Sequence, residues 1–118
     1  MAKTMNYTKG KWEAYQTEKL PERWEVCAGL EGNQGICKTL LDNSIPPDEK
    51  RANAQLICSA VNACASVNPD NPQAVAESIK DMYEALKILI AWAKCLAPND
   101  TATQKGIEAL SKAGGKHA

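Results

Sequence analysis

The sequence predicts an α+β fold, in which a small N-terminal antiparallel β meander packs on a helical hairpin and a short C-terminal helix follows. Two observations predict it. Residues 1–45 contain short apolar clusters separated by turn residues, whereas residues 46–118 contain long apolar runs with helical spacing. The 118 residues suit a single domain over residues 1–118.

The meander is expected within residues 1–45. Apolar clusters at residues 12–15, 24–28 and 36–41 predict two or three short strands, and Trp24, Val26 and Ala28 show the alternation of a half-buried strand. Pro21 separates the first two clusters, and the glycine-rich residues 29–35 provide a turn before the third. Strands this short need a helix to cover one face.

The helical hairpin is expected over residues 46–97. Its first helix begins at the prolines of residues 46–47, where acidic residues face the positive end of the helix dipole, and continues to about residue 66. After a break, Asn71 is expected to cap the second helix and Pro72 to be its first residue. Thr101 and Gln104 predict a capping box for the last helix, residues 100–114.

The second helix, residues 72–96, has the strongest pattern. One face carries apolar residues in steps of three and four: Val75, Ile79, Met82, Leu86, Leu89, Ala93 and Leu96. Its C-terminal half is apolar almost all round, which predicts a buried helix. The strands can cover one side, so we expect a second copy of the chain to cover the other. The expected interface residues are Tyr83, Ile88, Ile90 and Trp92.

Several classes of function conflict with the composition. Fourteen basic and fourteen acidic residues give zero formal charge, which argues against a nucleic-acid partner. The one histidine is His117, and no glycine-rich phosphate loop is present, so we expect no enzyme, catalytic residue, metal or cofactor. The five cysteines form no CxxC pair and are expected to be buried and reduced. No secretory signal or membrane span is recognised, which predicts a cytoplasmic protein.

Four residues are candidate ligand contacts. Arg23 and Trp24 are adjacent and suit a phosphate and a base, and Arg51 lies in the first turns of a helix, where anions are favoured. Asn53 could tie that helix to the meander or contact a ligand. The alternative is that both arginines lie on the surface and that the tryptophans are core or interface anchors.

Three segments carry a resemblance to a known group. They are the T-x-G-x-W segment of residues 8–12, the ANAQLI run of residues 52–57, and the MYEALKILIAW run of residues 82–92. Over residues 7–96 the chain resembles a family of small phage and prophage accessory proteins, in which an E-A-N-A-x-L-I helix follows a meander. Lys9 and Lys11 stand near positions where that family tends to have prolines.

The resemblance implies phage or mobile-element origin and an accessory role. With the small size, the missing catalytic residues, the expected association of copies and the two arginine sites, it leads us to expect a phage-encoded, non-enzymatic protein of the host cytoplasm that counters host defence by binding. One form of this function sequesters a nucleotide immune signal between subunits. A second form inhibits a host defence protein through a protein–protein surface, as anti-CRISPR proteins do. A structural or regulatory interaction module of the phage is the remaining alternative.

Overall fold

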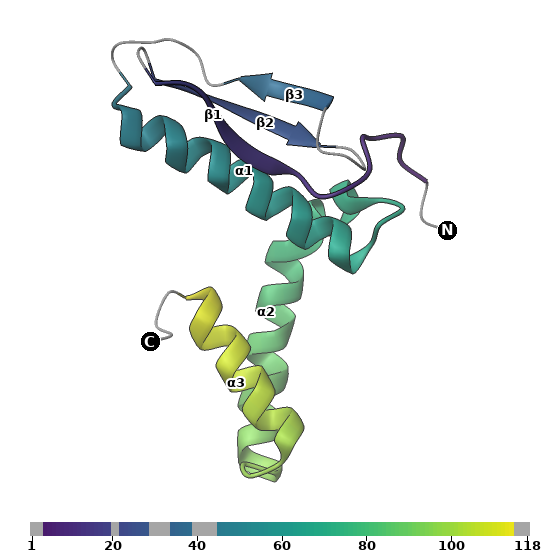
Figure 1. Ribbon diagram of the computed structural model, residues 1–118. Helices are drawn as coiled ribbons and strands as arrows, with labels where there is room; N and C mark the ends of the chain where they lie inside the picture. Colours follow the sequence, from purple (N-terminus) through teal and green to yellow (C-terminus); the bar gives the residue numbers. More distant parts are fainter. Residues whose placement is uncertain (1–3, 20–21, 29–33, 39–44, 115–118) are drawn as a thin grey trace. The chain divides into compact units, whose positions relative to one another are not determined.

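The computed structural model describes residues 4–19, 22–28, 34–38 and 45–114 (Figure 1). It confirms the α+β fold, with three antiparallel strands followed by three helices. The strands are β1 (Glu13–Lys19), β2 (Glu22–Ala28) and β3 (Gln34–Lys38). The helices are α1 (Pro47–Val67), α2 (Pro72–Leu96) and α3 (Thr101–Ala113). The turn was expected over residues 29–35, and its last two residues, Gln34 and Gly35, instead belong to β3. Residues 29–33 of that turn, the connection at Pro21 and residues 39–41 of the third cluster lie outside the described residues.

The sheet has the order β1-β2-β3, and β2 is its central strand. Trp24, Val26 and Ala28 of β2 share the face that packs inward, as their alternation predicted, and Val26 and Ala28 are fully buried. The register shifts once between β1 and β2 and once between β2 and β3, so the sheet is irregular on both sides of its central strand.

Helix α1 covers the inner face of the sheet (Figure 1). The core consists of Val26 from β2 with Ala54 and Cys58 from α1. Around it pack four partly buried side chains, Trp12, Ala14, Trp24 and Ile36. Because Ala54 and Cys58 are small, the helix can approach the strands closely, and the tryptophans fill the space beside it.

The helix ends follow local sequence signals with one correction. Helix α1 begins after Pro46, and the Asn71 side chain caps α2 by accepting from the backbone N–H of Ala74 at 3.1 Å. The expectation that Thr101 caps α3 is wrong. Asp100 is the cap, since its carboxylate accepts from the N–H of Ala102 at 2.9 Å. An Asp one residue earlier satisfies the same orphan donors and adds a negative charge at the positive end of the helix.

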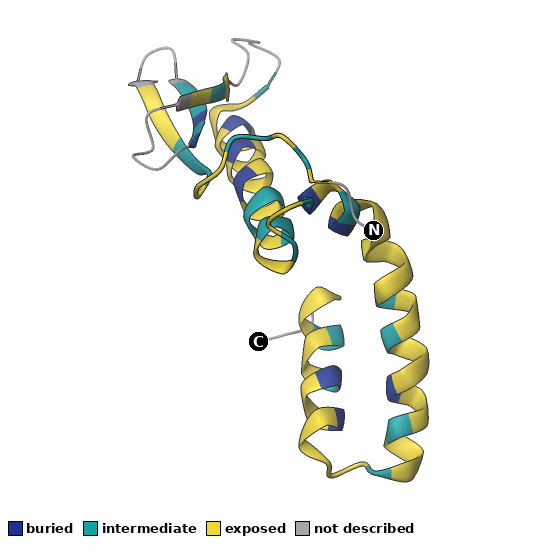
Figure 2. Ribbon diagram, turned by 90° about the vertical axis from the view of Figure 1, so that its right-hand side faces the viewer, coloured by how far each residue is buried: buried dark blue, intermediate teal, exposed yellow. Residues whose placement is uncertain are grey.

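The chain forms two compact units, Met1–Ala76 and Glu77–Ala118. The sheet, α1 and the first turn of α2 belong to the first unit. In the second unit, α2 and α3 run side by side as an antiparallel pair (Figures 1 and 2). A single domain over residues 1–118 and a hairpin over residues 46–97 therefore stay predictions. None of the described helices has an apolar stretch long enough to cross a bilayer.

Candidate functional site

The segment that precedes β1 is anchored to the connection between α1 and α2. The backbone N–H of Met5 donates to the carbonyl of Asp70 at 2.6 Å, and the Tyr7 hydroxyl donates to the carbonyl of Pro69 at 2.6 Å. The Lys9 ammonium lies 3.6 Å from the centre of the Tyr7 ring and 3.3 Å from the same Pro69 carbonyl. An irregular segment is thus held in place by groups about sixty residues away in the chain.

The same segment is fixed to the C-terminal third of α1 by one amide. Asn62 accepts from the backbone N–H of Trp12 at 2.9 Å and donates to the carbonyl of Trp12 at 2.8 Å. The amide therefore pairs with the backbone as a neighbouring strand would. Gly10, with φ of 97°, supplies the left-handed conformation just before Trp12 that residues with a Cβ rarely adopt. Asn53, for which the sequence offers either a tie to the meander or a ligand contact, has an exposed side chain, and the tie that the described residues show is made by Asn62.

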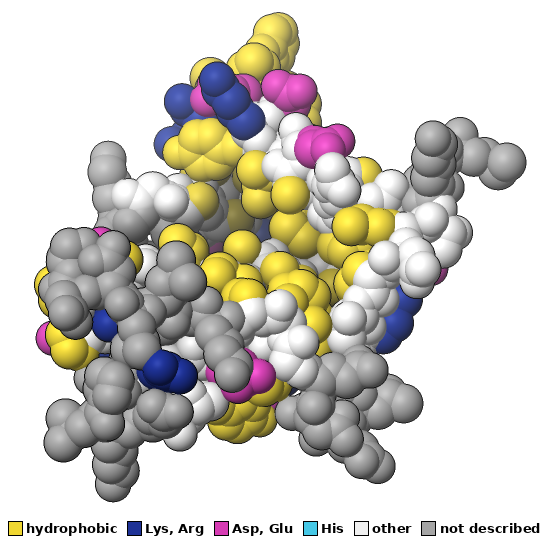
Figure 3. Space-filling model, turned by 90° about the horizontal axis from the view of Figure 1, so that it is seen from above, with side chains coloured by type: hydrophobic (Ala, Val, Ile, Leu, Met, Phe, Trp, Pro, Cys, Tyr) yellow, Lys and Arg dark blue, Asp and Glu magenta, His cyan; other side chains and the backbone are white. Residues whose placement is uncertain are grey.

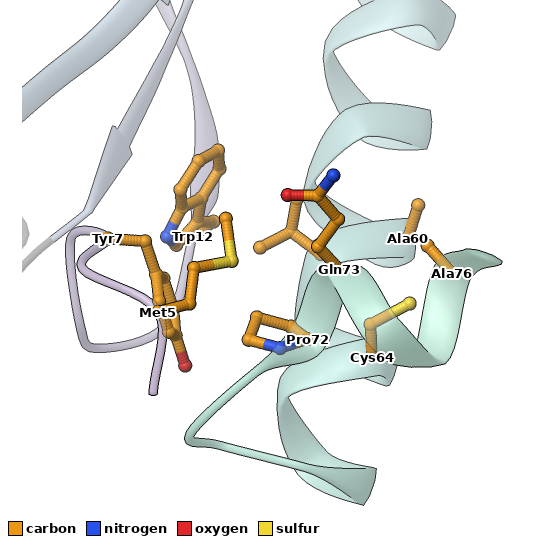
Figure 4. A pocket seen from close by; sticks show the side chains of 9 residues that line it. Met5, Tyr7, Trp12, Ala60, Cys64, Pro72, Gln73 and Ala76 are labelled. Atoms are coloured by element: carbon orange, nitrogen blue, oxygen red, sulfur yellow. The ribbon is translucent and has the colours of Figure 1, made fainter. Parts of the chain in front are cut away.

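These contacts hold one wall of an apolar pocket within the first unit (Figure 4). Its volume is about 250 Å³, and its walls come from the N-terminal segment, from α1 and from the first turns of α2. The lining residues are Met5, Tyr7, Trp12, Ala60, Val61, Cys64, Pro72, Gln73 and Ala76. No charged side chain is among these nine residues, which distinguishes the pocket from a phosphate or nucleotide site.

In the second unit, α3 contacts α2 at very short range. A Cβ added at Gly106 of α3 would overlap the Ile90 side chain of α2 and touch Leu86. Ile90 is buried, and Tyr83, Leu86 and Ala93 on the same side of α2 are half-buried. Gly106 is therefore the position that lets the two helices approach.

A second face of α2 remains uncovered. It carries Met82, Ala85, Leu89, Trp92 and Leu96, which follow one another in steps of three, four, three and four, and all five are exposed. We call these five residues the α2 seam. Trp92 is 68% exposed and Leu96 is 79% exposed. Figure 3, which views the molecule from the end that carries the sheet, shows further hydrophobic side chains on that face. In the single chain this face of α2 is exposed, and its burial by a second copy stays a prediction. The spacing is that of the a and d positions of a coiled coil.

The candidate ligand contacts are spread over different surfaces. Trp24 packs against the core beneath the sheet, so the alternation of β2 directs the half-buried Arg23 to the opposite face. Arg51 and Asn53 are exposed on α1. None of the four lines the apolar pocket. Their role in ligand binding stays a prediction, and a base stacked on Trp24 beside a phosphate held by Arg23 would require a different arrangement.

The expected interface residues divide into two groups. Ile90 is buried and Tyr83 is half-buried on the side of α2 that faces α3. Ile88 and Trp92 are exposed, at 61% and 68%, and Trp92 belongs to the α2 seam. The periodicity of the sequence does not distinguish these two faces, because it carries no information on which part of α2 is covered by α3.

The cysteines differ in burial. Cys58 is buried in the core, and burial raises the pKa of its thiol. Cys27 and Cys64 are half-buried, whereas Cys37 and Cys95 are exposed, which corrects the expectation that all five are buried. Within the described part of the chain, no three acidic, cysteine or histidine side chains are grouped as a metal site would require. The register places Cys27 opposite Gly35 and Cys37 opposite Val26.

Comparison with known proteins gives no relative for this chain: no family model, no curated protein and no solved structure matches it.

Proposed function

We propose that the protein is a non-enzymatic binding protein that acts as a dimer, in which two copies associate along the α2 seam. The supporting observation is the exposed seam itself. Five exposed apolar residues with heptad spacing are costly to leave in water, and this spacing matches a second helix lying along the first.

The sizes of the seam residues favour a second copy in an antiparallel arrangement. With a twofold axis at Leu89, Leu89 meets its own copy, Met82 meets Leu96, and the small Ala85 meets the large Trp92. The smallest residue of the seam then faces the largest, as in well-packed cores, and the other two pairs match side chains of similar size. Such a contact is isologous and closes at two subunits.

The dimer is tested by sedimentation velocity at micromolar concentration. We expect a dimer for the wild-type chain and a monomer for Leu89→Asp, which places a charge at the centre of the seam. Ala91→Asp is the matched control, since Ala91 is exposed on the same helix but outside the seam. A monomeric wild-type chain would refute the proposal, and so would a dimer that Leu89→Asp leaves intact.

The antiparallel pairing is tested by exchanging large and small residues. Ala85→Trp should oppose one tryptophan to another and weaken the dimer, and Trp92→Ala should weaken it by loss of a buried anchor. We expect Trp92→Ala to raise the dissociation constant about thirtyfold, corresponding to about 2 kcal/mol. The double variant should recover most of the loss. Two additive losses would contradict the pairing of Ala85 with Trp92.

For the biological role, we propose a phage accessory protein that counters host defence by binding. The resemblance of residues 7–96 to that family supports this setting. The first form to test is sequestration of a nucleotide immune signal, for which Arg23 and Arg51 supply two guanidinium groups in each chain and four in a dimer. Titration calorimetry with cyclic and linear nucleotides tests it, and absence of heat at high protein concentration would eliminate it.

The second form is inhibition of a host protein through the α2 seam. It is favoured if the wild-type chain is a monomer, because the seam is then free for another partner. A pull-down from host lysate with the wild-type chain and with Trp92→Ala separates the two forms. Loss of a captured protein from a folded Trp92→Ala variant supports the inhibitor, and identical capture by both chains contradicts it.

A further inference from the structure

The pocket of the first unit has two opposed walls of different origin. Figure 4 shows Met5, Tyr7 and Trp12 on the side of the N-terminal segment, and small side chains of the two helices, such as Ala60 and Cys64, on the other. The first wall is held by the bonds to Pro69, Asp70 and Asn62 described above. The pocket is therefore largely preformed, which lowers the cost of ordering it around a ligand.

The chemistry of the walls favours a neutral ligand. The Tyr7 hydroxyl already donates to the Pro69 carbonyl, and the Trp12 indole N–H donates to the Thr8 carbonyl at 3.0 Å. Lys9 is not among the lining residues, and its ammonium lies by backbone carbonyls and over the Tyr7 ring. A charged group that entered the pocket would lose hydration without gaining an opposite charge.

The wall chemistry and the size of the pocket favour a flat ring system. Two aromatic rings and the Met5 thioether form one wall, and aromatic and sulfur groups both pack well against aromatic ligands. An apolar cavity of about 150 Å³ accommodates benzene. By that scale a volume of about 250 Å³ accommodates about ten non-hydrogen atoms, the size of two fused rings.

We propose that this pocket binds a small, neutral, bicyclic aromatic molecule. The site uses no residue of the α2 seam, so it is independent of the proposed dimer. Ala60, Cys64 and Ala76 are the residues that create the space, because a larger side chain at any of them would project into the volume. The sequence could not indicate the site, because its aromatic wall is an irregular segment that is placed by contacts distant in sequence.

Indole is the probe for the direct test. Titration of the full-length, ¹⁵N-labelled chain should shift the Trp12 indole resonance and the amides of residues 60–64 in a saturable way. The expected dissociation constant is below about 1 mM, an ordinary ligand efficiency for a probe of this size. Indole-3-acetate, which carries a carboxylate, should bind at least tenfold more weakly. Tighter binding of 1-hexanol than of indole would overturn the aromatic class.

A variant that fills the pocket tests whether indole binds at this site. Ala60→Leu should weaken indole binding at least tenfold. Ala63→Leu adds the same side chain at an exposed position on the same helix that does not line the pocket, and it should bind indole as the wild type does. Equal binding by the two variants would refute the site.

Thiol protection tests the same site without a substitution. In the wild-type chain, indole should slow alkylation of Cys64 by N-ethylmaleimide at least threefold. The exposed Cys95 of the second unit is the internal control and should react at an unchanged rate. Absence of any saturable shift, or an unchanged Cys64 rate at saturating indole, would overturn the proposal.

Discussion

Truncation of Asn62 should weaken the attachment of the N-terminal segment to α1. Asn62→Ala removes two hydrogen bonds to the backbone of Trp12, of 2.9 Å and 2.8 Å. At about 1 kcal/mol for each bond, the loss is about 2 kcal/mol. Both residues are only half-buried, so water can reach the groups that are left, and we add no further penalty. Alanine gains about 0.5 kcal/mol in helix propensity, which leaves a net loss of about 1.5 kcal/mol.

Asn53→Ala is the matched comparison on the same helix. Asn53 is exposed, and its truncation to alanine gives the same gain in helix propensity. The difference in free energy of unfolding between the two variants therefore measures the hydrogen bonds of Asn62 to Trp12. We expect the free energies of unfolding to differ by about 2 kcal/mol, with Asn62→Ala the less stable variant.

Urea unfolding followed by tryptophan fluorescence measures this difference. In a Trp92→Phe background the remaining tryptophans, Trp12 and Trp24, both report on the first unit. Removing Trp92 also alters the α2 seam, so coupling of unfolding to association is reduced. If the two variants unfold within about 0.5 kcal/mol of each other, the amide does not hold the segment, and the argument for a preformed pocket wall is refuted.

Three further outcomes are expected. Asp100→Ala should destabilise α3 by about 1 kcal/mol, whereas Thr101→Ala should cost less; the reverse order in thermal unfolding would restore Thr101 as the cap. Gly106→Ala should lower stability by about 1 kcal/mol despite its better helix propensity, because the new Cβ overlaps Ile90; a rise in melting temperature would contradict that packing. Burial raises the pKa of the Cys58 thiol above its ordinary value of 9.0, so the folded chain keeps this proton to higher pH than the unfolded chain does. The bound proton therefore contributes fully to the free energy of unfolding below pH 9.0, and this contribution is lost as pH rises above 9.0. Urea unfolding should show a lower free energy of unfolding at about pH 10 than at about pH 7, and the decrease should be smaller in Cys58→Ala.

The starts of α1 and α2 were predictable because their signals are local. Pro46, Asn71 and Pro72 act on the turns beside them, so the starts of α1 and α2 follow from neighbouring residues. The alternation of Trp24, Val26 and Ala28 likewise marks the inner face of β2 without reference to other parts of the chain.

The candidate sites were less predictable because they depend on distant pairings. Asn62 acts on backbone atoms of Trp12 that are fifty residues away, and no residue type in the sequence marks a backbone group as a partner. In the sequence the α2 seam is part of a wider apolar face of the helix. The contact between Gly106 and Ile90 is needed to distinguish the side that α3 covers from the exposed seam. Arg23 and Trp24 show the opposite case: they are neighbours in the sequence, but successive residues of a strand point to opposite faces of the sheet, so the two side chains do not form one site.

The anchoring of the N-terminal segment also sets an order of events during synthesis. Tyr7 is made before its partner Pro69, which lies 62 residues later, so the first unit cannot be completed until the end of α1 has been made. At roughly 5–20 residues per second, the segment waits about 3–12 seconds for its anchor. During that interval the aromatic side chains of the segment are exposed on the nascent chain, where they are accessible to chaperones.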